Sequence, residues 1–138
     1  MSDADFPITI FHNPNCGTSR NVVAMVQAAG YAPEVVDYLK AGWTREQLLD
    51  LATRSGLTLR DLMRDRGTPA AELGLLDAGA TDAQILEAMI AHPILVNRPI
   101  VMTPRGVGLC RPSEAVLDLL DNGPEGFTKE DGEVVAPR

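Results

Sequence analysis

Residues 8–21 read ITIFHNPNCGTSRN, and this stretch decides how the chain begins to fold. Its first four residues are mostly apolar and follow Pro7, which is typical of a short buried strand. The next segment, residues 13–17, is rich in Asn, Pro and Gly and predicts a turn. Apolar residues then recur with helical spacing as far as Gly30, which is placed to end a helix. The stretch therefore predicts a strand, a turn that carries Cys16, and a helix.

The first third of the chain closes with a second strand, and the middle is helical. Residues 34–38 contain two adjacent valines and predict a strand that pairs in parallel with the first. Capping boxes begin at Thr44 and Thr81, each followed by an apolar helical pattern. A further short helix is expected over residues 58–63. The pair His92-Pro93 ends the last of these helices.

The last third returns to strands. Residues 100–103 and 107–110 flank a Pro-Arg-Gly turn, which predicts a hairpin. Residues 113–120 then have the apolar spacing of a closing helix. The tail after about Asp121 is rich in Gly, Pro and charged residues, and we expect it to be loose.

The order of the predicted elements is βαβ, a helical insertion, and then ββα. An α/β fold with a mixed four-stranded sheet and flanking helices accommodates this order, and it is the thioredoxin-like arrangement. The chain contains no internal repeat, linker or second domain. We therefore expect residues 1–138 to form one domain.

Composition narrows the class of protein. The chain has 138 residues, of which 45% are hydrophobic and 22% charged, which is ordinary for a globular protein. A formal net charge of −7 disfavours non-specific nucleic-acid binding, which needs clustered Lys and Arg. The acidic start lacks a signal peptide, and no apolar run reaches the length of a membrane span. We expect a cytoplasmic monomer that binds neither nucleic acid nor membrane.

The cysteines and histidines exclude two kinds of stabilising site. Cys16 and Cys110 are the two cysteines, far apart in the sequence, and they do not form a disulfide framework. His12 and His92 are the two histidines, and neither belongs to a Cys-x-x-Cys or His-x-x-x-His set. No metal is expected.

Cys16 is the first candidate for chemistry, because it lies between a buried strand and a helix. The first N–H groups of a helix lack partners within the helix, and together with the helix dipole they favour an anion. A cysteine thiol at such a place has a lowered pKa, and its thiolate is a nucleophile. The same N–H groups can hold an oxyanion beside the sulfur.

The spacing around Cys16 excludes two known types of thiol enzyme. A dithiol oxidoreductase has Cys-x-x-Cys, but the fourth position here is Ser19, either a helix-start residue or a direct contact. A covalent intermediate on Cys16 must then be released by an outside thiol or by Cys110, which otherwise has a structural role. Phosphatase-like loops have Cys-x5-Arg, and Val22 occupies that arginine position.

Four segments together carry a family resemblance. The segments ITIFHNPNCGTSRN, HPILVNRPIV and GLCRPSE follow one another in this order, and FTKEDGE lies in the tail. In this the chain resembles the glutaredoxin-linked arsenate reductases of the ArsC type, from Ile8 to about Leu120. The resemblance implies that Cys16 attacks arsenate, and that Pro99 forms a cis peptide bond opposite this nucleophile.

The resemblance also implies an oxyanion site and its electrostatics. Three arginines complete the site, and by their motifs they are Arg64, Arg98 and Arg111; Arg60 or Arg66 could replace the first of them. Guanidinium groups are permanently charged and donate bidentate hydrogen bonds, so they suit a tetrahedral oxyanion. His12, four residues before the cysteine, is implied to help keep the thiol ionised.

The implied activity is reduction of arsenate to arsenite through a thio-arsenate adduct on Cys16. Glutathione is then the co-substrate that resolves the adduct, glutaredoxin is the partner that recovers the mixed disulfide, and no cofactor is bound. Two other functions compete with this interpretation. Regulators of the same superfamily bind RNA polymerase, although they often have the Cys-x-x-Cys that is missing here. A monothiol glutaredoxin-like enzyme would act on mixed disulfides without arsenate.

Overall fold

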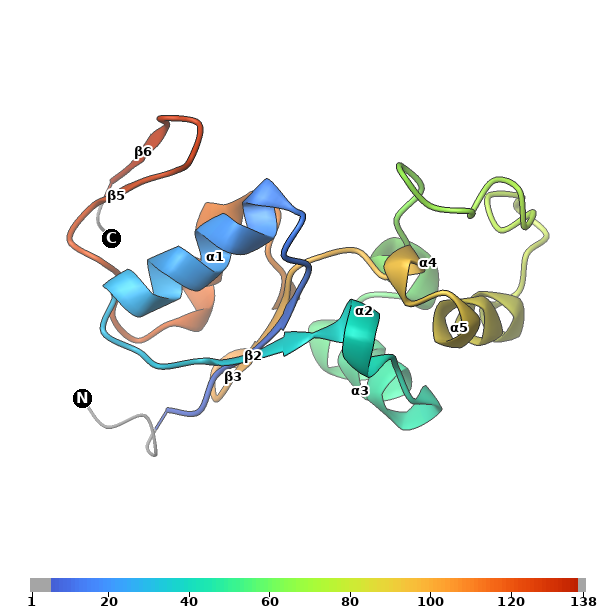
Figure 1. Ribbon diagram of the computed structural model, residues 1–138. Helices are drawn as coiled ribbons and strands as arrows, with labels where there is room; N and C mark the ends of the chain where they lie inside the picture. Colours follow the sequence, from blue (N-terminus) through green and yellow to red (C-terminus); the bar gives the residue numbers. More distant parts are fainter. Residues whose placement is uncertain (1–5, 137–138) are drawn as a thin grey trace. The chain divides into compact units, whose positions relative to one another are not determined.

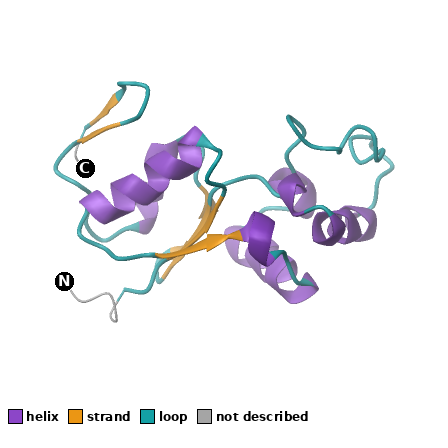
Figure 2. Ribbon diagram, viewed as in Figure 1, coloured by secondary structure: helices purple, strands orange, loops and turns teal. Residues whose placement is uncertain are grey.

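A computed structural model describes residues 6–136 of the protein, which form two compact units. The sheet unit contains the described residues up to Asp37 and from Arg98 onward, and the helical unit contains Tyr38–Asn97. Figure 1 labels their elements, and Figure 2 shows that the strands of the described residues all belong to the sheet unit. The helical unit is thus the insertion between the second and third strands that the sequence predicted.

The sheet unit begins with the predicted strand, turn and helix. Its elements are β1 (Thr9–His12), α1 (Gly17–Ala28), β2 (Glu34–Asp37), β3 (Ile100–Thr103), β4 (Gly106–Leu109), the 3-10 helix η3 (Ser113–Leu119), β5 (Phe127–Thr128) and β6 (Val134–Val135). Gly30 has a φ of 98°, which favours glycine, and its N–H donates to Gln27 as the chain leaves α1. The second strand ends one residue earlier than expected, at Asp37.

The four main strands form a mixed sheet in the order β2-β1-β3-β4. β1 and β2 are parallel, as predicted, while β3 is antiparallel to β1 and to β4. Phe11 of β1 pairs with Ile100, and Ile100 pairs with Leu109. The end of β1, the start of β3 and the end of β4 therefore meet at one edge of the sheet. This is the mixed four-stranded, thioredoxin-like sheet that the order of elements predicted.

The core of the sheet unit joins α1, η3 and one face of the sheet. Ile10 and Val101 of neighbouring strands and Val22, Met25 and Val26 of α1 are each fully buried in one apolar cluster. Alternate residues of a strand face the same side, and residues three and four apart share one face of a helix. The periodicity seen in the sequence therefore determines which side of α1 faces the sheet.

The C-terminal part differs from expectation in two respects. The predicted closing α-helix over residues 113–120 is a 3-10 helix, Ser113–Leu119. The tail expected to be loose after about Asp121 contains a paired hairpin, in which Phe127 aligns with Val135. Val135 is 8% exposed and belongs to the core cluster of the sheet unit. The tail is ordered because one buried side chain and several polar contacts anchor it, although its composition is that of a loop.

The helical unit consists of short helices with strong caps. They are α2 (Tyr38–Ala41), α3 (Arg45–Ser55), α4 (Leu59–Leu62), α5 (Asp82–Ala91) and the 3-10 helix η2 (Pro93–Leu95). The predicted capping boxes at Thr44 and Thr81 are present, and Thr58 forms a third with Asp61. Gly56 ends α3 with a left-handed φ of 72°. His92 ends α5, as the sequence indicated.

We expect the stability of the helical unit to depend on one face of α3. Leu48 is fully buried, whereas its neighbour Leu49 is 45% exposed. Leu48→Ala should lower the free energy of unfolding by about 2–5 kcal/mol, because it removes buried methyl groups and leaves a cavity. Leu49→Ala is the matched control on the same helix and should cost well under half as much. Urea denaturation followed by circular dichroism measures both, and equal losses would contradict this assignment of the buried face.

Candidate functional site

Cys16 is the N-cap residue of α1 and is held by a tight loop. Its N–H donates to the Asn13 carbonyl at 3.0 Å, and the Asn15 N–H donates to Asn13 Oδ1 at 2.9 Å. Asn13 is itself 2% exposed. These bonds make the segment between β1 and α1 an ordered turn, and they leave the sulfur beside the free N–H groups of the helix.

Hydrogen bonds from three residues surround the sulfur. The Ser19 backbone N–H and the Arg98 side chain are near enough to the sulfur to lower its pKa by hydrogen bonding. Nη1 of Arg111 lies 3.6 Å from Sγ. Burial raises the pKa of the Cys16 thiol, but the Ser19, Arg111 and Arg98 hydrogen bonds and the charge of Arg98 together bring it below the ordinary value. Cys16 is thus set up to carry a thiolate.

The register of the sheet explains why two distant arginines meet. Ile100 pairs with Leu109, so Arg98 and Arg111 continue the same antiparallel pair of segments beyond the strands. The Cys110 N–H donates to the Pro99 carbonyl at 2.9 Å, and Nη1 of Arg111 donates to the Arg98 carbonyl at 2.9 Å. Both guanidinium groups therefore arise at the edge of the sheet where β1 ends and leads to Cys16.

Two proline bonds flank this pair of segments. The Arg98–Pro99 peptide bond is cis, which is the geometry that the resemblance implies for Pro99. The Arg111–Pro112 bond is also cis, and nothing in the sequence analysis indicated it. Each of the two arginines therefore directly precedes a cis-proline.

His12 contacts the site through Ser19. His12 Nδ1 lies 2.6 Å from the Ser19 hydroxyl oxygen, which also accepts the Asn13 N–H at 3.1 Å. Burial lowers the pKa of His12, Asp37 raises it and Arg20 lowers it, with a net value below the ordinary one. The imidazole is therefore neutral near pH 7 and holds the serine whose N–H bonds the sulfur. Ser19 lies in the first turn of α1, and its backbone N–H is directed at Cys16.

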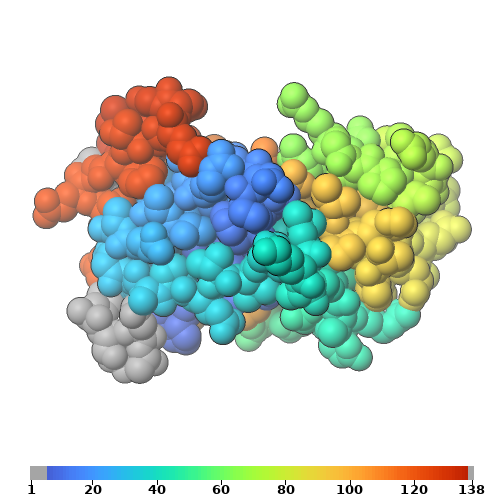
Figure 3. All heavy atoms as spheres, viewed as in Figure 1, coloured from blue at the N-terminus to red at the C-terminus, as the bar shows by residue number. Residues whose placement is uncertain are grey.

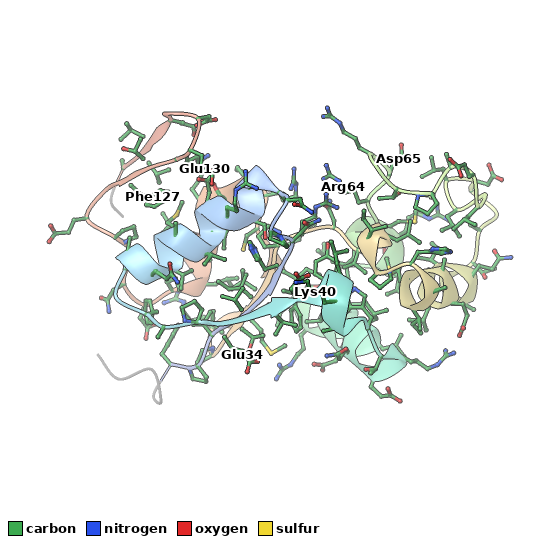
Figure 4. The ribbon with its side chains drawn as sticks, in the orientation of Figure 1. Glu34, Lys40, Arg64, Asp65, Phe127 and Glu130 are labelled. Carbon is green, nitrogen blue, oxygen red and sulfur yellow. The ribbon has the colours of Figure 1, made fainter. Side chains whose placement is uncertain are left out.

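The third predicted arginine belongs to the helical unit. Arg64 lies just after α4, where its N–H donates to the Leu95 carbonyl at 2.7 Å and its Nη1 donates to Asn97 Oδ1 at 3.3 Å. Figure 4 labels it at the start of the loop that follows α4. Arg60, one of its two possible replacements, donates to the carbonyls of Leu75, Asp77 and Ala80. Arg60 thus holds the long loop between α4 and α5, which favours Arg64 or Arg66 as the candidate.

Cys110 differs from Cys16, because its surroundings raise the pKa of its thiol. It lies just beyond β4, is 1% exposed and belongs to the core cluster. Burial, with a smaller contribution from Asp118, raises its pKa to about 12. A buried neutral thiol is a poor nucleophile, so the structural alternative for Cys110 is the better supported of the two.

Two contacts of the Cys16 loop were missed by the sequence analysis. Asn13 could have been recognised from the Asn-Pro-Asn turn signal, because Asn side chains commonly bond the backbone two residues on. Nη1 of Arg20 donates to the Pro14 carbonyl at 2.8 Å, while its Nε and Nη2 donate to Glu130. No local sequence signal could link Arg20 to Glu130, because the two residues lie 110 positions apart.

The part of the chain that the structure describes contains neither a metal-binding cluster nor a membrane-spanning helix. Within residues 6–136, His, Cys, Asp and Glu form no group of three or more that could hold a metal ion. No helix in that part of the chain is long and apolar enough to cross a membrane.

The hydrogen bonds to Sγ predict how Cys16 responds to pH. Only the thiolate reacts with iodoacetamide, so its alkylation rate rises through the pKa. Arg111→Gln removes one of the lowering hydrogen bonds and should move the midpoint of this rise to higher pH. Mass spectrometry of the Cys16 peptide measures the rate, and Arg105→Gln is the control, because Arg105 pairs with Asp121 instead. An unchanged midpoint in Arg111→Gln would contradict the assigned contact.

Comparisons with known proteins agree with the geometry. The ArsC family model matches residues 11–119. The arsenate reductase ArsI2 of Synechocystis is 61% identical over 129 residues, which cover 93% of this chain and 92% of that protein. An arsenate reductase of Rhizobium meliloti is 54% identical over the same shares of the two chains. The structure of an arsenate reductase from Vibrio cholerae is 36% identical with a TM-score of 0.79, and the match covers 83% of this chain and 98% of that one. This chain belongs to the ArsC family.

Proposed function

We propose that the protein reduces arsenate to arsenite, with Cys16 as the nucleophile. The observation that carries the proposal is the set of donors around one sulfur, from Ser19, Arg98 and Arg111. Thiolate and arsenate are both anions and repel each other. Two guanidinium groups and a helix N-terminus offset that repulsion at the point where the two must meet.

The first step forms a bond between sulfur and arsenic. The Cys16 thiolate attacks the pentavalent arsenic, and one arsenate oxygen takes up two protons and leaves as water. The product is a thio-arsenate ester on Cys16, with arsenic still pentavalent. Arg98 and Arg111 bind the remaining oxygens, and the family resemblance assigns a third guanidinium to Arg64.

The second step reduces the arsenic. A glutathione thiol attacks the Cys16 sulfur, the electron pair of the S–As bond goes to arsenic, and arsenite leaves in the trivalent state. Cys16 and glutathione then form a mixed disulfide, which a glutaredoxin thiol reduces to regenerate the Cys16 thiolate. The external thiols are supported by Ser19 at the position of a second cysteine and by the burial of Cys110.

Two further residues have supporting roles in this proposal. His12 acts as a positioning residue, because its contact is to the Ser19 hydroxyl. Pro99 shapes the backbone between Arg98 and β3, where its carbonyl accepts the Cys110 N–H. The protein acts as a cytoplasmic monomer, with glutathione as co-substrate and no bound cofactor.

The direct test is arsenate-dependent oxidation of NADPH, coupled through glutathione reductase and glutaredoxin. Wild type should turn over, and Cys16→Ser should fall below detection. Arg98→Gln and Arg111→Gln should each lower kcat/KM by about 10- to 100-fold, because each loses a charge-assisted hydrogen bond to the oxyanion. Cys110→Ala and Arg105→Gln are the controls and should keep near wild-type rates.

Two outcomes would favour the competing functions. Turnover by Cys16→Ser at the wild-type rate would remove the proposed nucleophile. Reduction of a glutathione mixed disulfide without arsenate, together with no arsenate turnover, would indicate a monothiol glutaredoxin-like enzyme. Capture of RNA polymerase subunits by a protein inactive on arsenate would indicate a regulator instead.

A further inference from the structure

The backbone of the loop that carries Cys16 is held by residues of the loop itself and by the Ser19 and Arg20 side chains of α1. Asn13 holds the N–H groups of Asn15 and Cys16, and all of these lie between β1 and α1. The Pro14 carbonyl is different, because it accepts a hydrogen bond from Nη1 of Arg20 at 2.8 Å. Arg20 follows Cys16 by one helical turn, and its N–H donates to the Cys16 carbonyl at 3.0 Å. The side chain of Arg20 thus folds back over the loop.

Glu130 of the C-terminal hairpin fixes the direction of that guanidinium. Its two carboxylate oxygens accept from Nε and Nη2 of Arg20, both at 2.9 Å. Such a bidentate pair fixes the plane of the guanidinium, which leaves Nη1 directed at the Pro14 carbonyl. Figure 4 labels Glu130 beside α1, and in Figure 3 the red C-terminal residues lie against blue residues of the α1 region.

The hairpin has its own attachments to the sheet unit and does not depend on Arg20. The Lys129 side chain is 9% exposed, and its ammonium pairs with Glu114 at 3.0 Å and with Glu133 at 3.1 Å. The Glu130 N–H donates to Asn21 Oδ1 at 3.0 Å, and Val135 is buried in the core cluster. Glu130 is therefore held from several sides, so it can serve as a fixed support for Arg20.

We propose that Arg20 and Glu130 are a positioning pair that connects the C-terminal hairpin to the loop of the nucleophile and holds Cys16 in its hydrogen bonds. Neither side chain needs to touch substrate for this role. The proposal deepens the proposed function, on which its kinetic part rests. It also explains why residues 127–135 form an ordered hairpin, because this segment helps to hold the Cys16 loop in place.

The charge of Arg20 offers a competing explanation, and it makes an opposite prediction. The guanidinium is near enough to Cys16 for the thiolate to favour its charged form. If charge alone mattered, Glu130→Gln would unmask the positive charge of Arg20 and lower the pKa of Cys16. If position matters, the same change loosens the loop, weakens the hydrogen bonds to Sγ and raises that pKa.

Two variants test the Arg20–Glu130 pair, and a variant of a second exposed ion pair is the control. Glu130→Gln removes the partner charge, and Arg20→Lys keeps the charge but loses the planar set of donors. The control is Asp121→Asn, because the Asp121–Arg105 pair is also exposed, in the same unit, and contacts no residue of the Cys16 loop. Circular dichroism and the melting temperature check that each variant is folded.

The first readout is the pH midpoint of Cys16 alkylation by iodoacetamide, which needs no arsenate. Both Glu130→Gln and Arg20→Lys should move the midpoint to higher pH, while Asp121→Asn should leave it in place. The second readout is arsenate kinetics, in which we expect kcat to fall about two- to fivefold, since an exposed ion pair couples weakly. KM for arsenate should change less than kcat.

The outcomes separate this proposal from the proposed function. A midpoint that falls or stays unchanged in Glu130→Gln and stays unchanged in Arg20→Lys would overturn the positioning role. A rise in both variants supports it, even if wild type fails to reduce arsenate, in which case the proposed function alone is rejected. If Glu130→Gln does not fold, Arg20→Lys decides by the direction of its midpoint.

Discussion

An anionic sulfur that is removed from water needs hydrogen-bond donors on several sides, and the sheet unit is arranged around that need. Burial alone would raise the pKa of Cys16 and leave it an inert thiol. The start of α1 supplies a backbone donor, and the adjacent ends of β3 and β4 supply two guanidinium groups. The loop geometry, the strand register and the placement of the arginines all bring hydrogen-bond donors to the buried sulfur and so stabilise the thiolate.

The two cysteines of the chain have pKa values shifted in opposite directions by their surroundings. Cys110 is 1% exposed against 9% for Cys16 and lies among apolar side chains, and burial raises its pKa to about 12. Cys16 is less deeply buried, and it also has hydrogen-bond donors that lower its pKa. His12 fits the same scheme, because a neutral imidazole bonded to Ser19 helps the sulfur by holding a donor in place. In the proposed mechanism, His12 therefore supports ionisation of Cys16 indirectly, through Ser19.

Local signals predicted what local physics determines. The strand, turn and helix around Cys16 follow from apolar spacing and turn residues, and the capping boxes marked the starts of two helices correctly. Arg98 and Arg111 were found through the resemblance, and the hairpin register explains afterwards why they meet. Their grouping depends on strand pairing, which a residue pattern does not display. The position of Arg64 relative to the sulfur stays a prediction, as does the single domain over residues 1–138.

The tail shows why composition is a weak guide to tertiary contacts. Gly, Pro and charged residues indicated a loose segment, yet Lys129, Glu130 and Val135 each have partners elsewhere in the sheet unit. The pairing of Glu130 with Arg20 spans most of the chain, so no window of sequence contains it. The 3-10 form of η3 was missed for a related reason, since apolar spacing alone does not separate it from an α-helix over so few residues.

Titration of both cysteines in one sample decides whether the folded protein stabilises Cys16 as a thiolate. Protein labelled with ¹³C at the cysteine Cβ reports each ionisation separately by NMR, and Cys16→Ser assigns the signals. We expect the Cys16 signal to titrate below the ordinary thiol pKa of about 8.5, while the Cys110 signal changes only in strongly alkaline solution. A Cys16 signal that titrates at or above the ordinary value would contradict the account.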